Sequence, residues 1–137
     1  MFIQTIKLAG FNKGKLTLLQ NLSLTAADFT GRTSGADVHL SPDGAYLYAS
    51  NRGSANQITL FAVNKDNGQL TVVDRYPTDR TPRSFVIEPS GNFMLVAAQD
   101  GNSITEFKID KSTGKLTLTP EKVEVNQATC VKLVSAE

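Results

Sequence analysis

The sequence has 137 residues, of which 40% are hydrophobic and 20% are charged, and its formal net charge is +1. This composition is ordinary for a globular domain, and so small a net charge, without any run of like charges, predicts no nucleic-acid partner and no membrane anchor. The apolar first ten residues lack the pattern of a signal peptide. Cys130 is the single cysteine, which excludes an internal disulfide and fits a cytoplasmic location; we expect it to be a small buried hydrophobic residue.

The predicted elements are short strands throughout, because no stretch has the 3.6-residue period of a helix. In chain order, residues 2–9 and 15–24 predict two strands, and residues 37–76 and 82–125 each predict four strands separated by turns. Residues 129–134 predict one further strand. Several strands are apolar on both faces, which is expected when each face of a sheet is covered.

Three short motifs recur in the same order along the chain, at spacings of 46, 47 and, for the first recurrence, 54 residues. GKLTL at residues 14–18 recurs as GQLTV at 68–72 and as GKLTL at 114–118. SPDGAYLY at residues 41–48 matches EPSGNFML at 88–95, and ITLF at 58–61 matches ITEF at 104–107. Four short strands in each repeat are typical of a propeller blade.

The sequence therefore predicts an all-β fold, a single partial β-propeller domain with blades of four antiparallel strands. Residues 1–25 supply the outer strands of one blade, residues 37–76 and 82–125 make two full blades, and residues 129–134 supply a closing inner strand. These segments amount to about two and three-quarter blades, whereas a closed propeller needs at least about four. Either the chain is part of a longer protein, or it self-associates through its open blade edges.

Polar residues of chemical interest fall at equivalent places in the two full blades. Asp37 and His39 are two residues apart on an inner strand, so their side chains point to the same side. Arg52 follows the second strand of that blade, Arg83 opens the next inner strand, and Gln99 ends the strand after it. Because inner strands line the channel of a propeller, we expect these groups to converge near one of its mouths.

Beyond the general propeller pattern, the chain resembles the seven-bladed lactonase family, which includes bacterial 6-phosphogluconolactonase and fungal carboxymuconate cyclase. The segments that carry the resemblance are DFTG at 28–31, ADVHLSPDG at 36–44, LYASNRG at 47–53, TPRSF at 81–85, AAQD at 97–100 and CVKL at 130–133. The match runs along nearly the whole chain and corresponds to the C-terminal portion of the family's propeller. One departure is Gln127-Ala128, where a proline is usual in the family.

The resemblance implies a hydrolase that opens a sugar-acid lactone, with 6-phosphogluconolactone as the favoured substrate and 6-phosphogluconate as the product. It implies a catalytic set and a substrate-binding set of residues: His39, Arg52, Arg83 and Asp37 for the first, and Gln99, Asp100 and Asn51 for the second. A histidine suits a general base, Asp37 would orient it, and an arginine can hold an anionic group or stabilise charge on a carbonyl oxygen. We expect no metal and no cofactor.

Each of these residues also has a purely structural explanation. His39 can bond within its blade, Arg83 can bind a loop carbonyl, Asp37 can hold a turn or a hydroxyl, and Arg52 can pair with Asp43 or Asp100. A non-catalytic propeller that binds or scaffolds a partner, or an inactive fragment of the enzyme, therefore stays open, because this fold hosts many functions.

Overall fold

The computed structural model describes residues 5–136, which form strands, turns and irregular segments. Its ten strands are β1 (Thr5–Asn12), β2 (Lys15–Ser23), β3 (Thr33–Leu40), β4 (Tyr46–Gly53), β5 (Gln57–Val63), β6 (Leu70–Pro77), β7 (Pro82–Ile87), β8 (Phe93–Ala98), β9 (Ser103–Ile109) and β10 (Leu116–Glu124). No helix within residues 5–136 has the length and apolar character needed to cross a membrane.

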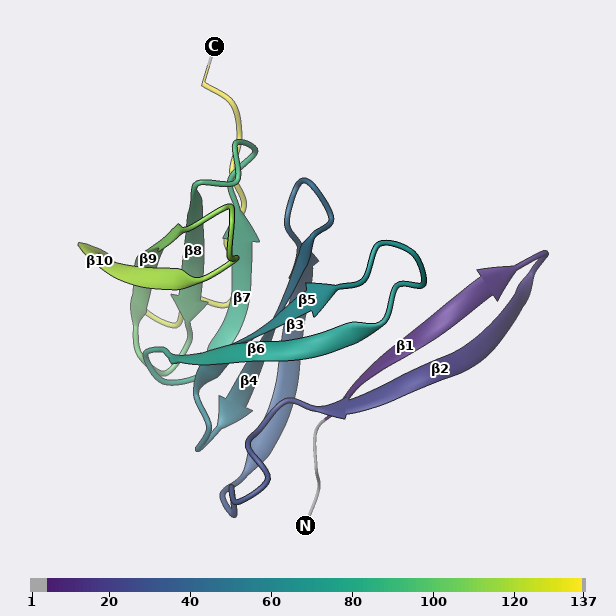
Figure 1. Ribbon diagram of the computed structural model, residues 1–137. Coiled ribbons are helices and arrows are strands. Elements are labelled where there is room, and N and C mark those ends of the chain that lie inside the picture. Colours follow the sequence, from purple (N-terminus) through teal and green to yellow (C-terminus); the bar gives the residue numbers. More distant parts are fainter. Residues whose placement is uncertain (1–4, 137) are drawn as a thin grey trace.

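The strands form three antiparallel sheets, one of two strands and two of four strands (Figure 1). In each four-stranded sheet the spatial order follows the chain, as β3-β4-β5-β6 and as β7-β8-β9-β10. The expected all-β fold with four-stranded antiparallel blades is therefore confirmed. We call the first sheet blade A and the second blade B.

The two blades pack face to face over a shared apolar core. Tyr48, Ile58 and Leu60 of blade A meet a set of fully or nearly fully buried side chains of blade B, namely Phe85, Met94, Val96, Phe107, Ile109 and Leu116. This packing explains why the central strands are apolar on both faces. It also places β3 and β7, the inner-edge strands of the two blades, next to each other, where the Phe85 N–H donates to Asp37 Oδ2 at 3.1 Å.

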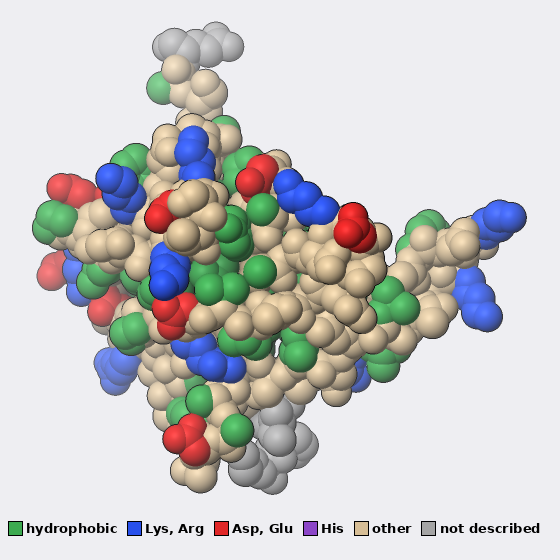
Figure 2. Space-filling view, viewed as in Figure 1, with side chains coloured by type: hydrophobic (Ala, Val, Ile, Leu, Met, Phe, Trp, Pro, Cys, Tyr) green, Lys and Arg blue, Asp and Glu red, His purple; other side chains and the backbone are tan. Residues whose placement is uncertain are grey.

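The β1–β2 hairpin extends away from the two blades (Figure 1). At its base, Leu24 packs with Phe61 and Leu70 of blade A. The Gln20 side chain also bonds the backbone of Leu70, donating to its carbonyl and accepting from its N–H, both at 2.8 Å. The outer part of the hairpin carries exposed hydrophobic side chains, with lysines at its tip (Figure 2).

Residues 129–134 form no strand in the structure, although the sequence predicts an inner strand there. A strand is defined by pairing with a neighbour, and within residues 5–136 this segment has no strand beside it to pair with. Instead, Ala128 and Val131 are buried against Ala97 of blade B. Cys130 is exposed, so the expectation that it is buried is wrong; the neighbouring Ala128 and Val131 take the buried positions.

Candidate functional site

Asp37 and His39 form a pair on β3, as the alternation of side chains along a strand predicts. His39 Nε2 lies 3.2 Å from Asp37 Oδ2. The pairing of β3 with β4 is interrupted between Gly35 and Val38, and at this irregularity the Asp37 N–H donates to Ser50 Oγ at 3.0 Å. This irregularity in the β3–β4 pairing therefore sets the position of the Asp37 carboxylate.

The Asp37 carboxylate is held in its charged form by its neighbours. Burial raises the pKa of Asp37. The N–H of Phe85, the hydrogen bond and charge of His39, and the N–H of Val38 together lower it by more, so the pKa lies below its ordinary value. A carboxylate beside an imidazole fixes which ring nitrogen faces outward. Among the described residues His39 Nδ1 has no hydrogen-bond partner, and the His39 side chain is 35% exposed, so Nδ1 can meet a water molecule.

The ring of His39 also contacts blade B. It packs edge to face on Phe85, with ring centroids 4.8 Å apart and an interplanar angle of 75°. Together with the bond from the Phe85 N–H to Asp37, this contact ties the pair to β7. The Asp37–His39 pair thus lies at the junction of two neighbouring inner strands.

Arg83 lies on β7, two residues before Phe85, and binds an amide instead of the loop carbonyl considered above. Its Nη1 donates to Gln99 Oε1 at 3.0 Å, and Gln99 Nε2 donates in turn to Gln127 Oε1 at 3.2 Å. Gln127 has a positive φ of 52°. Sequence reasoning missed its role, although the absence of the usual proline at this point was the available signal.

Arg52 lies at the end of β4 and is bound to its own blade. Its Nη2 donates to Ser34 Oγ at 3.0 Å and to the Gly35 carbonyl at 3.2 Å, while its Nε is buried without a partner. In the described part of the chain the ion pairs are His39 with Asp37 and Lys122 with Asp79. The proposed salt bridge from Arg52 to Asp43 or Asp100 is therefore wrong.

Asn51 and Asp100 have different surroundings. Asn51 is fully buried, and its Oδ1 accepts the N–H of Ser34 at 2.9 Å, so it lies in the packing of blade A. Asp100 is near the surface, where its Oδ2 accepts the hydroxyl of Thr81 at 2.5 Å. Of these two predicted substrate contacts, Asp100 is the one that lines an open space.

That open space is a cleft of about 460 Å³ between the two blades, which we call the inter-blade cleft. It lies where β3 and β7 begin and where β4 and β8 end. Its lining consists of polar and charged residues apart from one glycine: Arg32, Ser34, Arg52, Gly53, Ser54, Thr81 and Asp100. Arg32, Ser34, Ser54 and Thr81 were not predicted from the sequence.

The structure therefore brings the predicted residues together in groups instead of at one point. In the β3–β4 ladder, Ser34 lies opposite Arg52 and His39 lies opposite Tyr48. Arg52 and Tyr48 are four positions apart on β4, so these two places in the ladder are separated by about 13 Å. Asp37 and His39 form one group, Arg83 and Gln99 a second on the neighbouring inner strand, and Arg52 and Asp100 line the inter-blade cleft. No group of three or more metal-ligand side chains is formed among residues 5–136.

Comparison with known proteins identifies a family whose model matches this chain. The family model described as "Lactonase, 7-bladed beta-propeller" matches residues 3–133. A 6-phosphogluconolactonase of Serratia proteamaculans is 42% identical over 106 residues, which are 77% of this chain and 32% of that protein. A protein of the same name from Formosa agariphila is 46% identical over 100 residues, which are 72% of this chain and 28% of that protein.

Solved structures agree with the sequence comparison. A periplasmic gluconolactonase of Pseudomonas aeruginosa superposes with a TM-score of 0.87 and 35% sequence identity. The superposition covers 90% of this chain and 34% of that one. The chain spans about a third of the length of the relatives that it matches.

Proposed function

Because the chain belongs to the lactonase family of seven-bladed β-propellers, we propose that it is part of a hydrolase that opens a sugar-acid lactone. The proposed substrate is 6-phosphogluconolactone and the product 6-phosphogluconate, the activity for which the Serratia and Formosa relatives are named. We also propose that the protein acts in the cytoplasm, since a single cysteine suits a reducing compartment.

The observation that carries the proposal is the Asp37–His39 pair on the inner-edge strand β3. His39 Nε2 faces the Asp37 carboxylate, and Nδ1 has no hydrogen-bond partner among the described residues. In the proposed reaction His39 Nδ1 takes a proton from a water molecule, whose oxygen forms a bond to the lactone carbonyl carbon. The bond between that carbon and the ring oxygen then breaks, the ring oxygen receives the proton from His39, and the Asp37 carboxylate stabilises the imidazolium formed in between.

Arginines and amides would hold the substrate around this pair. Arg83, which is exposed and oriented by Gln99, can donate to the carbonyl oxygen as negative charge grows on it. Arg52 and Asp100 would contact more distant oxygens of the substrate from the inter-blade cleft. Asn51 would act indirectly, by holding the β3 backbone through Ser34.

A second function is favoured by a specific observation. The Asp37 carboxylate already accepts N–H groups from Val38 and Phe85, so the pair could serve only to join two blades of a non-catalytic propeller or of an inactive fragment. In that case His39 and Asp37 would matter for stability and not for catalysis.

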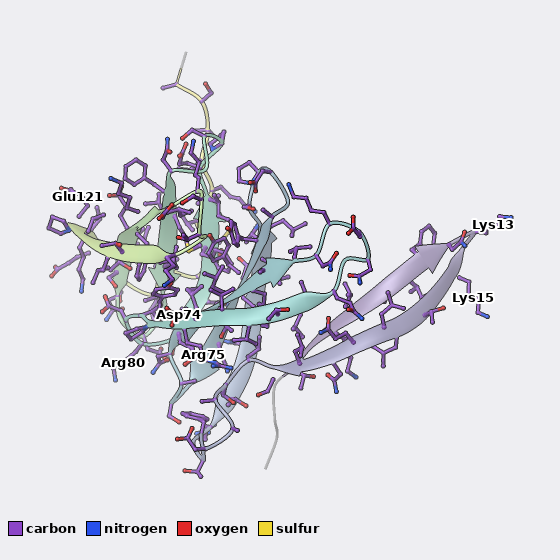
Figure 3. The ribbon with its side chains drawn as sticks, in the orientation of Figure 1. Lys13, Lys15, Asp74, Arg75, Arg80 and Glu121 are labelled. Carbon is purple, nitrogen blue, oxygen red and sulfur yellow. The ribbon has the colours of Figure 1, made fainter. Side chains whose placement is uncertain are left out.

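Hydrolysis of freshly prepared 6-phosphogluconolactone, measured above its spontaneous rate, separates the two functions. We expect His39→Gln to lower kcat by about 100-fold or more while the melting temperature changes little. Lys15→Ala is the control, because Lys15 lies on the hairpin away from the blades (Figure 3).

Two results would contradict the proposal. One is a parent chain that does not accelerate hydrolysis, and the other is a His39→Gln variant that keeps its activity. A His39→Gln variant that loses stability but no activity would favour the structural function.

A further inference from the structure

Two arginines, Arg32 and Arg52, line the inter-blade cleft. Neither has a carboxylate within 4 Å, because the ion pairs in the described part of the chain are His39 with Asp37 and Lys122 with Asp79. Arg52 Nε is buried without a partner, and no hydrogen bond is made by the Arg32 side chain to any described residue. The cleft therefore contains two arginines that form no ion pair, with Asp100 as the one carboxylate in its lining.

The backbone of blade A brings the two arginines side by side. The Ser54 N–H donates to the Arg32 carbonyl at 2.9 Å, which continues the ladder one step beyond the pairing of Thr33 with Gly53 and of Ser34 with Arg52. Arg32 and Arg52 are thus diagonal neighbours, whose backbones lie about 7–8 Å apart, within reach of long side chains.

Gly53 allows this close approach between two backbone segments, the one at Arg32 and the end of β4. Its φ is +82°, and a Cβ on it would lie 2.3 Å from the Arg32 carbonyl oxygen. Any larger residue would push the Arg32 segment away from β4. The arginine-glycine order at 52 and 53 therefore has a geometric reason that concerns Arg32.

Blade B supplies the opposite wall of the cleft with different chemistry. Asp100 accepts the hydroxyl of Thr81 there, and the hydroxyls of Ser34 and Ser54 complete the lining. Two arginines suit a tetrahedral oxyanion, whereas a carboxylate and hydroxyls suit sugar hydroxyl groups. The expected ligand has an anionic end and a polyhydroxylated body.

We propose that the inter-blade cleft binds the phosphate group of a sugar phosphate between Arg32 and Arg52, and so selects phosphorylated over unphosphorylated substrates. The identity of the sugar acid rests on the function proposed above, whereas the binding of phosphate to the cleft does not. Arg32 is the residue added to the site by this proposal.

Titration calorimetry of the full chain with 6-phosphogluconate, gluconate and inorganic phosphate tests the proposal. We expect 6-phosphogluconate to bind at least about tenfold more tightly than gluconate, because the arginines make charge-assisted hydrogen bonds to phosphate. Arg32→Ala should remove that difference at an unchanged melting temperature, since the Arg32 side chain makes no bond that would be lost. Arg52→Lys, which keeps the charge but loses the planar fork, should weaken binding in the same direction.

The controls separate this proposal from the hydrolase. Lys15→Ala removes a remote positive charge and should leave all three affinities unchanged. Phosphate binding that persists in His39→Gln, with no hydrolysis by the parent chain, would support the cleft and contradict the lactonase. Equal affinities for 6-phosphogluconate and gluconate, or unchanged binding in Arg32→Ala, would overturn the cleft proposal even if the chain hydrolyses lactones.

Discussion

A hydroxyl and a carboxylate share the first tight turn of each blade, but in exchanged positions. In blade A the Ser41 hydroxyl donates to Asp43 Oδ1 at 2.6 Å. In blade B the hydroxyl of Ser90 donates to the carboxylate of Glu88, which also accepts the N–H groups of Ser90 and Asn92. The two residues exchange places while the same interaction closes both turns.

The Glu88 turn predicts a dependence of stability on pH. Hydrogen bonds from the Ser90 hydroxyl and from backbone N–H groups lower the Glu88 pKa from 4.5 to about 2. Because the folded-state pKa is the lower one, the stabilisation is complete above pH 4.5 and is lost as the pH falls towards 2. Glu88→Gln should therefore lower the free energy of unfolding at pH 7, and its difference from wild type should shrink between pH 4.5 and 2.

Chemical denaturation at several pH values measures this effect. Glu121→Gln is a suitable control, because Glu121 lies on the exposed strand β10 (Figure 3) and its carboxylate makes no hydrogen bond to a described residue. A Glu88→Gln difference that stays constant over the whole pH range would show that the carboxylate does not stabilise the turn.

At the scale of elements, two equivalent turns differ in what surrounds their glycines. Gly68 ends the β5–β6 turn at a φ of +74° with open space around it, whereas Gly114 ends the β9–β10 turn at +72° with the Tyr46 ring 2.6 Å from an added Cβ. The Tyr48 hydroxyl also donates to the Gly114 carbonyl at 2.7 Å. The turn of blade B is thus packed against blade A, and its counterpart is free.

Alanine substitutions at these two glycines should therefore have unequal costs. Gly68→Ala should cost about 1–2 kcal/mol, the strain of a left-handed residue. Gly114→Ala should cost about 1–3 kcal/mol more, because the ring of Tyr46 must move. Urea denaturation of both variants measures the difference, and equal costs would mean that the contact between turn and ring does not constrain the blade.

The repeats in the sequence were sufficient to predict the strands and turns, because hydrophobic pattern and turn chemistry are local. The same holds for the Asp37–His39 pair, which depends on alternation within one strand. The interruption of pairing between Gly35 and Val38 was not predictable, and neither was the place of Arg32, which depends on two chain segments meeting in space. The inner strand predicted at residues 129–134 depends on neighbouring strands from elsewhere, so it stays a prediction; by itself the segment is not assigned as a strand.

On the scale of the whole molecule, apolar surface is concentrated at both ends of the described chain. On one face of the β1–β2 hairpin, Phe11, Leu16 and Leu18 are 73%, 70% and 61% exposed. At the other end, Leu118, Val123 and Leu133 are also exposed. Exposed apolar faces of this kind favour association.

We therefore expect the isolated 137-residue chain to self-associate in the micromolar to millimolar range. Replacing Leu16 and Leu18 by lysine should shift the chain towards the monomer, because it places charges on the exposed face. Thr17→Lys is the matched control, since Thr17 is on the same strand but points to the other face. Light scattering over a concentration series measures the mass, and a wild-type chain that stays monomeric would refute this expectation.

The bond from the Phe85 N–H to the Asp37 carboxylate has a consequence for how the molecule opens. Repeat proteins are commonly described as rows of units, with a stability that sums the units and their nearest-neighbour couplings. Here the coupling includes that hydrogen bond from a backbone N–H to a side-chain carboxylate, the bonds of two tyrosine hydroxyls to backbone carbonyls, and a common apolar core. We therefore expect the two blades to open as a single cooperative unit, so that a local opening of one inner strand lowers the protection of the other strand's amides against hydrogen exchange.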